Sequence, residues 1–561
     1  MLKRLISKAQ SPAFILGLGF LFLLITCAYP FWILFYRSFF SGPSDSFTLK
    51  FLVEVFSSES SLIAIKNTVL VSACTSILSL VMALPLGWLL TRTNLPYKRW
   101  LRTLFCFPYA IQPYIGAIAW IYLANPSTGL LNHLFGNGFF NIYTFGGLIW
   151  VMSTFFYTFI LLILLASLDR MDPSLEEAAR ISGAGPARVF FQITIPLITP
   201  ALVSGALLVG LAAAASFGVP AMIGNPARIF LMTTKIYLFQ KMGSIDGIYL
   251  AGTMSIALLV LAGVVLLASH WIQKRYSYQI VSGKASRPSE IELGHLKTPA
   301  LIGSLLALFV LLALPLGAMI LAALGKVQGV LSWDNIGFQT IYQVLFNTHE
   351  TGRAIYNSLV LSVGAATVAT AVGMIIAYIQ YKTKMKGRHL LDVMASLPYS
   401  TPGTVVALAF ILAFSGRFLG VFPSLYNTLG IIWLAYMTKY ISFAVRTTGD
   451  GFTQIHDSLA EAARVSGANW WTTLKTIWFP LMKASLVASW FLIFMPCFSE
   501  LTMTILLTGP GIETIGTVMF QMQEYGDASG GGAAVLAFVV IFIVAIANAI
   551  VKTVSKGKYG L

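Results

Sequence analysis

The sequence predicts an all-α, polytopic membrane protein with about 12 transmembrane helices in two parallel six-helix repeats. The first observation is composition: 57% of the 561 residues are hydrophobic and 10% are charged, whereas soluble domains carry roughly 25% charged residues. The second is the length of apolar runs such as 14–36 and 534–551, because about 20 apolar residues cross a bilayer core. The third is that the second half of the chain repeats the pattern of the first.

The predicted spans also indicate an orientation. If the N-terminus lies inside, the inner segments hold about 26 Lys and Arg residues and the outer segments about nine, which is the asymmetry of the positive-inside rule. The net charge of +16 therefore belongs to inner loops and gives no reason to expect nucleic-acid binding. The spans are expected near 13–36, 62–90, 104–124, 145–168, 197–223, 248–272, 299–324, 355–380, 392–415, 427–448, 484–507 and 531–552. The four cysteines are scattered through these segments, and we interpret them as small buried hydrophobic side chains.

The repeat is visible at fixed spacings. Asn67 corresponds to Asn357, 290 residues later, and Glu177 corresponds to Glu461, 284 residues later. Each half then has six spans, so both halves share one orientation and form a parallel repeat. The predicted units are a first half at 1–276, a polar inner linker at 277–298 and a second half at 299–561.

Two small polar segments stand out between the fourth and fifth span of each half, "EEAARISGAG" at 176–185 and "AEAARVSGAN" at 460–469. The pattern predicts a short helix in each place. Asp172 and Asp457 are expected to cap these helices, since carboxylates at a helix start accept hydrogen bonds from free N–H groups.

The residues inside these segments also have expected roles. Arg180 and Arg464 follow each Glu by three residues and can brace it. Gly183 and Gly467 allow a sharp turn or the close approach of another surface. Two interpretations remain open at this point: capped interfacial helices that tie the spans together, or a docking surface for a soluble partner with two equivalent lobes.

These residues resemble the cytoplasmic signature of ATP-binding-cassette (ABC) importer permeases, which reads E-A-A, three residues, G, nine residues, I-x-L-P. The leucine before the proline is replaced by Ile195 and Phe479. The matching residues are Glu177, Ala178, Ala179, Gly183 and Ile193–Pro196 in the first half, and Glu461, Ala462, Ala463, Gly467 and Ile477–Pro480 in the second.

The resemblance implies the type I ABC importer transmembrane-domain fold and a non-catalytic membrane subunit. The two segments, including Arg180 and Arg464, would be coupling helices seated on two copies of a cytoplasmic ATPase. ATP and Mg²⁺ would be held by those partners and no cofactor by this chain. The sequence agrees, because none of its Gly-Lys pairs (Gly283-Lys284, Gly325-Lys326, Gly557-Lys558) is followed by the Ser or Thr of a P-loop.

The same resemblance implies further partners and a location. The protein is expected in the bacterial cytoplasmic (inner) membrane, surrounded by lipid, with both termini in the cytoplasm. A periplasmic or lipid-anchored substrate-binding protein would dock on the outer segments, which are expected near 125–144, 224–247, 325–354 and 508–530.

The cargo is the next question. Fused twelve-span permeases occur mainly among ferric-iron importers, and "SELTMTILLTGP" (499–510) resembles the pattern of that group. Thiamine, or another small solute such as a phosphonate or a polyamine, is the alternative within the same mechanism. An ion-driven secondary transporter, a membrane enzyme and a channel are further alternatives, and none of them explains the repeated polar helix.

Ionisable residues inside spans are candidates for the translocation path because they are costly in a bilayer. Glu500 is the foremost, and its counterpart in the first half is Ser216. Lys439 is a candidate partner for Glu500, and Tyr109 and Tyr399 offer hard oxygen donors beside prolines. No fixed metal site is expected, although Glu500 is a candidate transient ligand. Each of these residues also has a structural interpretation, as an ion pair or as an interface anchor.

Overall fold

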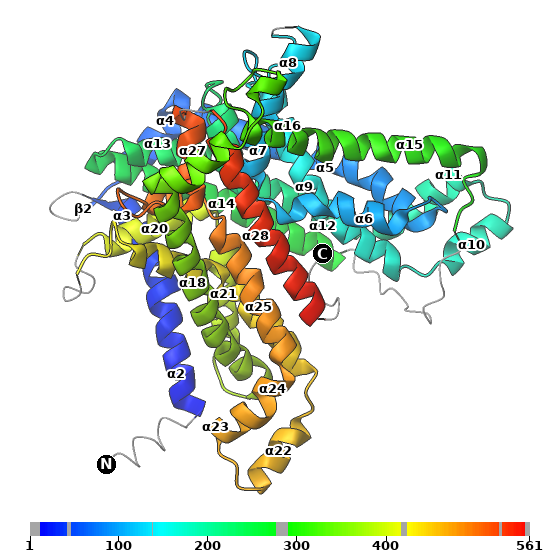
Figure 1. Ribbon diagram of the computed structural model, residues 1–561. Helices are drawn as coiled ribbons and strands as arrows, with labels where there is room; N and C mark the ends of the chain where they lie inside the picture. The colour runs from blue at the N-terminus through cyan, green and yellow to red at the C-terminus, as the bar shows by residue number, and fades with distance from the viewer. Residues whose placement is uncertain are drawn as a thin grey trace.

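The computed structural model describes residues 12–41, 46–136, 138–275, 290–416, 423–526 and 530–555, so the N-terminal residues and most of the predicted linker 277–298 lie outside it. The described chain is almost entirely helical (Figure 1). The long helices of the first half are α2 (Pro12–Leu23), α3 (Tyr29–Phe39), α5 (Glu59–Arg92), α6 (Lys98–Cys106), α7 (Pro113–Ala124), α9 (Phe145–Arg170), α12 (Ile195–Ala215) and α14 (Ile245–Arg275).

The second half repeats this order. Its long helices are α15 (Lys297–Leu308), α16 (Leu314–Leu324), α18 (His349–Lys382), α19 (Arg388–Ser400), α20 (Gly403–Phe414), α21 (Leu429–Thr453), α25 (Lys483–Phe498) and α28 (Gly532–Val554). Short elements connect them: β1 (Phe40–Ser41), β2 (Ser46–Phe47), α4 (Lys50–Ser57), α8 (Leu130–Phe135), α10 (Ser174–Ile181), α11 (Pro186–Val189), α13 (Met232–Lys241), α17 (Gln339–Tyr342), α22 (Asp457–Val465), α23 (Trp470–Thr473), α24 (Phe479–Leu481), α26 (Thr504–Leu507) and α27 (Ile515–Tyr525). Strands β1 and β2 form one small antiparallel pair.

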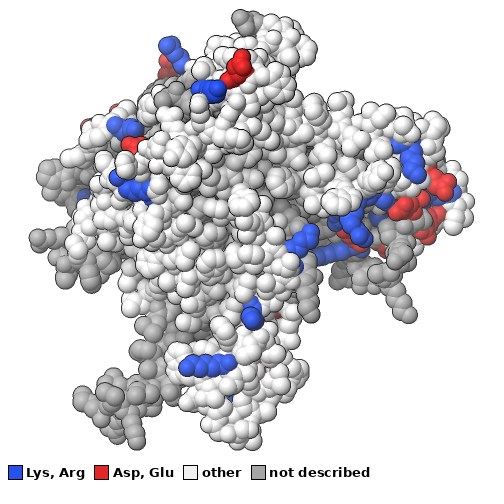
Figure 2. Space-filling model, viewed as in Figure 1, with Lys and Arg blue, Asp and Glu red and all other residues white. Residues whose placement is uncertain are grey.

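Most of the predicted spans have a long apolar helix. Within the described residues, eight helices are long and apolar enough to cross a membrane, and eleven if each of three bent pairs counts as one span. The remaining predicted span, 427–448, corresponds to α21, which carries Lys439 and Arg446 and is therefore less apolar. The broad middle of the face in Figure 2 is uncharged, and charged side chains gather at its edges, most densely on the right near α10.

Two of the bent pairs occupy equivalent positions in the two halves. Helices α6 and α7 meet at 101°, and helices α19 and α20 meet at 111°. Pro113 begins α7, and Pro402 precedes α20. Because the residue before a proline disfavours helical geometry and proline lacks an N–H donor, the helix breaks there. Hydropathy predicts each pair as one span, whereas the backbone turns sharply in the middle.

The first helix of each half packs mainly against the other half. Helices α2 and α3 lie along α18, α19 and α20, and α16 lies along α7, so each half extends an arm across its neighbour (Figure 1). The thiol of Cys27 donates a hydrogen bond to the Met394 carbonyl (3.1 Å), and the Tyr29 ring meets the Phe414 ring edge-on at 6.0 Å. These contacts join the halves into one body.

The described end of the linker is fixed to the first half. The Ile291 N–H donates to the Arg92 carbonyl (2.9 Å), and the Asn94 N–H donates to the Ile291 carbonyl (3.1 Å). The Lys98 ammonium pairs with the Glu290 carboxylate at 2.7 Å. This strap therefore lies beside the end of α5, close to the start of α6.

The prediction that all four cysteines are buried is wrong at one position. Cys27, Cys106 and Cys497 are buried, but Cys74 is exposed. It belongs to α5, whose outer face also exposes Ile77 and Val81. This face is apolar, which fits contact with lipid instead of water.

Candidate functional site

Helices α10 and α22, which we call the signature helices, lie at two far ends of the molecule (Figure 1). Helix α10 follows α9 and α22 follows α21, so each extends the end of a long helix of its own half. Both are short, with eight residues in α10 and nine in α22.

The two signature helices begin differently. The Asp172 carboxylate accepts a hydrogen bond from the Ser174 N–H (2.9 Å), and this bond lowers the pKa of Asp172. The prediction that Asp457 caps the second helix is wrong. There the His456 ring accepts from the Ser458 N–H (3.3 Å), while Asp457 is the first helical residue and binds Lys382.

The two signature helices end in the same way. Gly183 has φ = +86° and Gly467 has φ = +82°, a left-handed conformation that other residues adopt only with strain. The N–H of Gly183 donates to the Arg180 carbonyl, and that of Ala184 donates to the Ala179 carbonyl, both at 3.0 Å. The second copy has the equivalent bonds. This is the Schellman arrangement, so the predicted turn is formed at both glycines, and the close approach of another surface stays a prediction.

A buried ion pair attaches α10 to the spans of the first half. Arg92 Nε lies 3.0 Å from Glu176 Oε2, and the two side chains are 1% and 4% exposed. The Nε–H is not aligned for a hydrogen bond, so the contact is a charge pair. The Thr194 hydroxyl donates to the other carboxylate oxygen of Glu176 (2.5 Å). Sequence reasoning included Glu176 in the predicted polar segment 176–185 but missed this role, because Arg92 is far away in sequence.

The second half holds its signature helix differently. The counterpart of Glu176 is Ala460, which is buried. Lys382, the counterpart of Arg92, donates to the Asp457 carboxylate at 2.5 Å, and the Asp457 side chain is 72% exposed. Lys382 also donates to the Ile455 carbonyl (2.7 Å).

The predicted bracing by arginine is not formed as expected in the second copy. Arg464 makes no ion pair with Glu461 in the part of the chain that the structure describes. In the first copy, Arg180 Nε donates to the Glu176 backbone carbonyl (3.4 Å).

Both signature helices expose apolar side chains at equivalent positions. Leu175 and Ile181 are 51% and 88% exposed, and their counterparts Leu459 and Val465 are 46% and 91% exposed. Glu461 is exposed and Glu177 is partly buried. A single exposed apolar side chain is ordinary, but these side chains recur at equivalent positions of the two repeats, beside charged residues, as at surfaces that another protein covers.

Two of the residues predicted for the path, Tyr109 and Tyr399, lie at the two bends. The Tyr109 ring meets Phe159 edge-on at 5.1 Å, and the Tyr399 ring meets Phe443 edge-on at 4.8 Å. These pairs are equivalent in the repeat. Each bend therefore carries a tyrosine that packs against an aromatic ring of its own half.

Glu500 is buried beyond the end of α25, and its carboxylate is occupied by the chain that follows. It accepts hydrogen bonds from the Met503 N–H (2.9 and 3.1 Å), the Thr504 N–H (3.0 Å) and the Thr504 hydroxyl (2.7 Å). Among the described residues it forms no ion pair with Lys439, whose ammonium donates to the Thr401 carbonyl (2.5 Å). The backbone carbonyl of Ser216 accepts from the Thr233 hydroxyl (2.7 Å).

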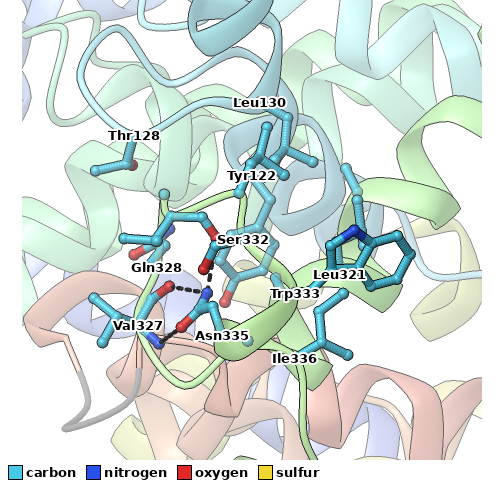
Figure 3. A pocket seen from close by; sticks show the side chains of 16 residues that line it. Tyr122, Thr128, Leu130, Leu321, Val327, Gln328, Ser332, Trp333, Asn335 and Ile336 are labelled. Atoms are coloured by element: carbon cyan, nitrogen blue, oxygen red, sulfur yellow. Dashed lines mark hydrogen bonds between the residues drawn. The ribbon is translucent and has the colours of Figure 1, made fainter.

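One of the predicted outer segments forms a loop that is closed by side-chain hydrogen bonds. Asn335 bonds to both backbone groups of Val327 and to the Val330 carbonyl at 2.8–2.9 Å, and the loop encloses a cavity of about 240 Å³ that Tyr122 also lines (Figure 3). Trp333 is 89% exposed. The side-chain bonds of Asn335 therefore join the two ends of this loop.

Comparison with known proteins bears on the repeat. Residues 83–277 and 369–558 both match the family "Binding-protein-dependent transport system inner membrane component". The chain is 26% identical over 501 residues to the ferric transport system permease protein FbpB of Actinobacillus pleuropneumoniae, covering 86% of this chain and 70% of the relative. It is 25% identical over 464 residues to the Fe(3+)-transport system permease protein FbpB 2 of Haemophilus influenzae, covering 82% and 83%.

A solved structure is also similar. A chain in the crystal structure of a bacterial alginate ABC transporter, in complex with an alginate pentasaccharide-bound periplasmic protein, covers 48% of this chain and 96% of its own length, with 20% identity and a TM-score of 0.38. The family match extends over more than half of the sequence and falls once on each six-helix repeat. The chain therefore belongs to the binding-protein-dependent transport system inner membrane component family, the membrane permeases of ABC importers.

Proposed function

We propose that this permease forms the translocation path of a ferric-iron importer and that its two signature helices dock on two copies of a cytoplasmic ATPase. The permease role follows from the family. The docking role is supported by one observation above the others: two helices with the same terminal geometry expose the same pair of large apolar side chains at equivalent repeat positions.

The proposed mechanism divides the work between chains. ATP and Mg²⁺ are bound by the ATPase subunits, and their closure draws α10 and α22 together. The two halves then rock against each other, and the path opens alternately to each side, which is a bistable element driven by a partner. In this arrangement the signature helices and both chain termini face the cytoplasm, and lipid surrounds the spans.

A substrate-binding protein is proposed to deliver the cargo at the opposite side. The loop around Asn335 supports this, because hydrogen bonds that already close the loop lower the entropy lost on docking. Trp333 projects from it, and tryptophan is among the residues that dominate protein interfaces. Phe139 of the neighbouring segment is 72% exposed and adds to the same outer edge.

The proposed cargo rests on the relatives. Two of them, similar along most of this chain, are named for ferric or Fe(3+) transport. Within the described residues, no three His, Cys, Asp or Glu side chains gather as a metal site, and we propose iron as a passing cargo and not as a resident ion. Tyr109, Tyr399, Lys439 and the segments around Ser216 and Glu500 are proposed to line or support the path.

The docking role is tested by reversing charge on both signature helices. The double variant Glu177→Lys and Glu461→Lys is expected to abolish iron uptake in reconstituted vesicles and to release the ATPase during co-purification. The permease should remain inserted and monodisperse, because both side chains lie outside the packed spans.

A matched control is Glu59→Lys, an exposed acid at the start of α5, at the opposite end of that helix from Arg92 and outside the predicted docking segments. It should leave uptake and ATPase co-purification unchanged. Normal ATPase binding by the double variant would contradict the docking role.

A further inference from the structure

Helix α21 carries a stripe of side chains that the proposed function does not use. Lys439, Phe443, Arg446 and Asp450 follow at helical spacing, which places them on one face of the helix. Lys439 and Phe443 are partly buried, whereas Arg446 and Asp450 are exposed. Arg446 lies about two turns before the end of α21, inside the predicted span 427–448.

This stripe faces the seam between the two halves. Phe443, between Lys439 and Arg446, packs edge-on against the Tyr399 ring at 4.8 Å. The Lys439 ammonium donates to the Thr401 carbonyl at the same bend (2.5 Å), and the Tyr114 hydroxyl at the first-half bend donates to the Ser499 carbonyl beside Glu500 (3.1 Å). Tyr109 belongs to the first half, where Phe159 holds it in the equivalent way. The stripe and the first-half bend therefore border the same space.

The charge in this space comes from one half. On α9, the counterparts of Lys439, Phe443 and Arg446 are Phe155, Phe159 and Leu162, which are uncharged. A third cation, Lys552 of α28, lines a crevice with Phe107 and Ala110, the neighbours of Tyr109. Asp450 is the acidic member of the stripe and lies one turn beyond Arg446, nearer the end of the helix.

The carboxylates nearest the stripe form no ion pair with its cations among the described residues, although Glu500 attracts Lys439 and Asp450 follows Arg446 by one turn. Neither Lys439 nor Arg446 forms an ion pair with any residue that the structure describes. Glu500 directs its carboxylate to the backbone N–H groups of Met503 and Thr504. A cation inside a span is costly and marks a functional position by default, and fixed positive charge in a low-dielectric passage repels a multivalent cation and attracts an anion.

We propose that the cargo crosses this permease as a net anion, with Lys439 and Arg446 forming a cationic step in the path. Resting on the proposed function, this means that ferric iron passes enclosed by oxyanion or carboxylate ligands and not as a bare cation. Guanidinium groups bind such oxygens in a bidentate manner, and the ring-stacked tyrosines offer hydroxyl donors beside them.

Charge reversal tests the proposal, because the two cargo forms predict opposite signs. The permease is reconstituted with its ATPase and its binding protein, and uptake of radioactive iron is measured for Arg446→Lys, Arg446→Gln and Arg446→Glu. An anionic cargo predicts near-normal uptake for Lys, a reduction for Gln and a loss of about tenfold or more for Glu, equal to ~1.4 kcal/mol or more in the barrier. Lys439→Gln should reduce uptake in the same direction.

Equal or faster uptake by Arg446→Glu would overturn the proposal, because an acid in the path assists a bare cation. Equal uptake by all three variants would also overturn it, since Arg446 would then be only an interfacial anchor. Lys386→Glu is the matched control, an exposed cation in the loop before α19 and away from the stripe. ATPase co-purification and gel filtration of each variant separate a loss of charge from a loss of folding.

The two proposals fail differently. If the wild-type complex imports no iron but imports an iron-free oxyanion such as phosphate, and Arg446→Glu abolishes that uptake, the ferric cargo is wrong and the anionic path is supported. If iron is imported and Arg446→Glu does not slow it, the ferric cargo stands and the anionic path is wrong.

Discussion

The two signature helices have nearly the same sequence and the same ending, yet they are attached to the protein in different ways. In the first half, Arg92 and Glu176 are both almost fully buried, and Thr194 completes the contact. In the second half, Lys382 reaches a carboxylate at the surface, on Asp457. Buried charges must remain paired, whereas exposed pairs contribute little. One helix is therefore locked to its spans and the other is tied loosely, although both present the same outer face.

The largest expected effect comes from breaking the buried pair. Glu176→Ala leaves the Arg92 guanidinium buried without a counter-charge, and such changes cost about 3–5 kcal/mol. The variant should show a large drop in thermal stability in detergent. The double variant Arg92→Leu with Glu176→Leu should recover most of the loss, because apolar replacement of a buried ion pair is often neutral or stabilising.

Asp169→Ala is the matched control for that experiment. It removes the acid from the Arg102–Asp169 pair, which is formed at 2.5 Å but is roughly half exposed on both sides. Loss of such a pair costs about 0–1 kcal/mol. If Glu176→Ala were no more damaging than Asp169→Ala, the first signature helix would not be locked by its carboxylate.

A smaller effect, equal for the two helices, is expected from substitution of the glycine that ends each signature helix. Gly183→Ala and Gly467→Ala each place a side chain on a left-handed residue, which costs about 1–2 kcal/mol. No other atom lies within 4 Å of the added Cβ at either position, so only the backbone strain counts. The two variants should weaken ATPase binding to the same extent in a titration. A clear difference between them would show that the partner contacts one turn more closely than the other.

The smallest effect is expected from the exposed tie. A hydrogen bond from Lys382 lowers the pKa of Asp457 below its ordinary value of 3.8. A carboxylate with a lowered pKa stabilises the folded state above its unfolded pKa, and this contribution is lost only as the pH falls through the folded value. Asp457→Asn should therefore change ATPase affinity slightly, and by the same amount at about pH 8 and about pH 5.5. An effect that vanished at the lower pH would assign the titration to another group.

The helical fold, the repeat and the signature helices could be predicted from the sequence, because they depend on hydrophobic runs and on local motifs. Gly183 could be predicted as a turn because a helix that ends on glycine needs nothing beyond its own backbone. The sequence predicted that the segment around Asn335 is an outer loop, but it did not predict the conformation of the loop. The bonds of Asn335 to Val327 and Val330 form only once the loop has folded.

The features that could not be predicted from the sequence depend on residues that are far apart along the chain. The partner of Glu176 is Arg92 on another helix, and no local pattern joins them. Asp457 was expected as a cap because its own position suited the role, but Lys382 competes for it and His456 takes the cap instead. Hydropathy likewise detects that 104–124 is apolar but not that it bends, because the break follows from Pro113 and its neighbour.

The crossed arms have a consequence for how the chain is made. Helices α2 and α3 are synthesised before the second half of the chain, but apart from α14 the long helices on which they rest begin only at His349. Helices α2 and α3 must therefore remain in the bilayer with one face in contact with lipid until the later helices are inserted. Cleavage of the chain in the linker would give two fragments. In each fragment, the first helix would lack the helices of the other half against which it mainly packs. Neither is expected to mature by itself, and both should mature when they are produced together.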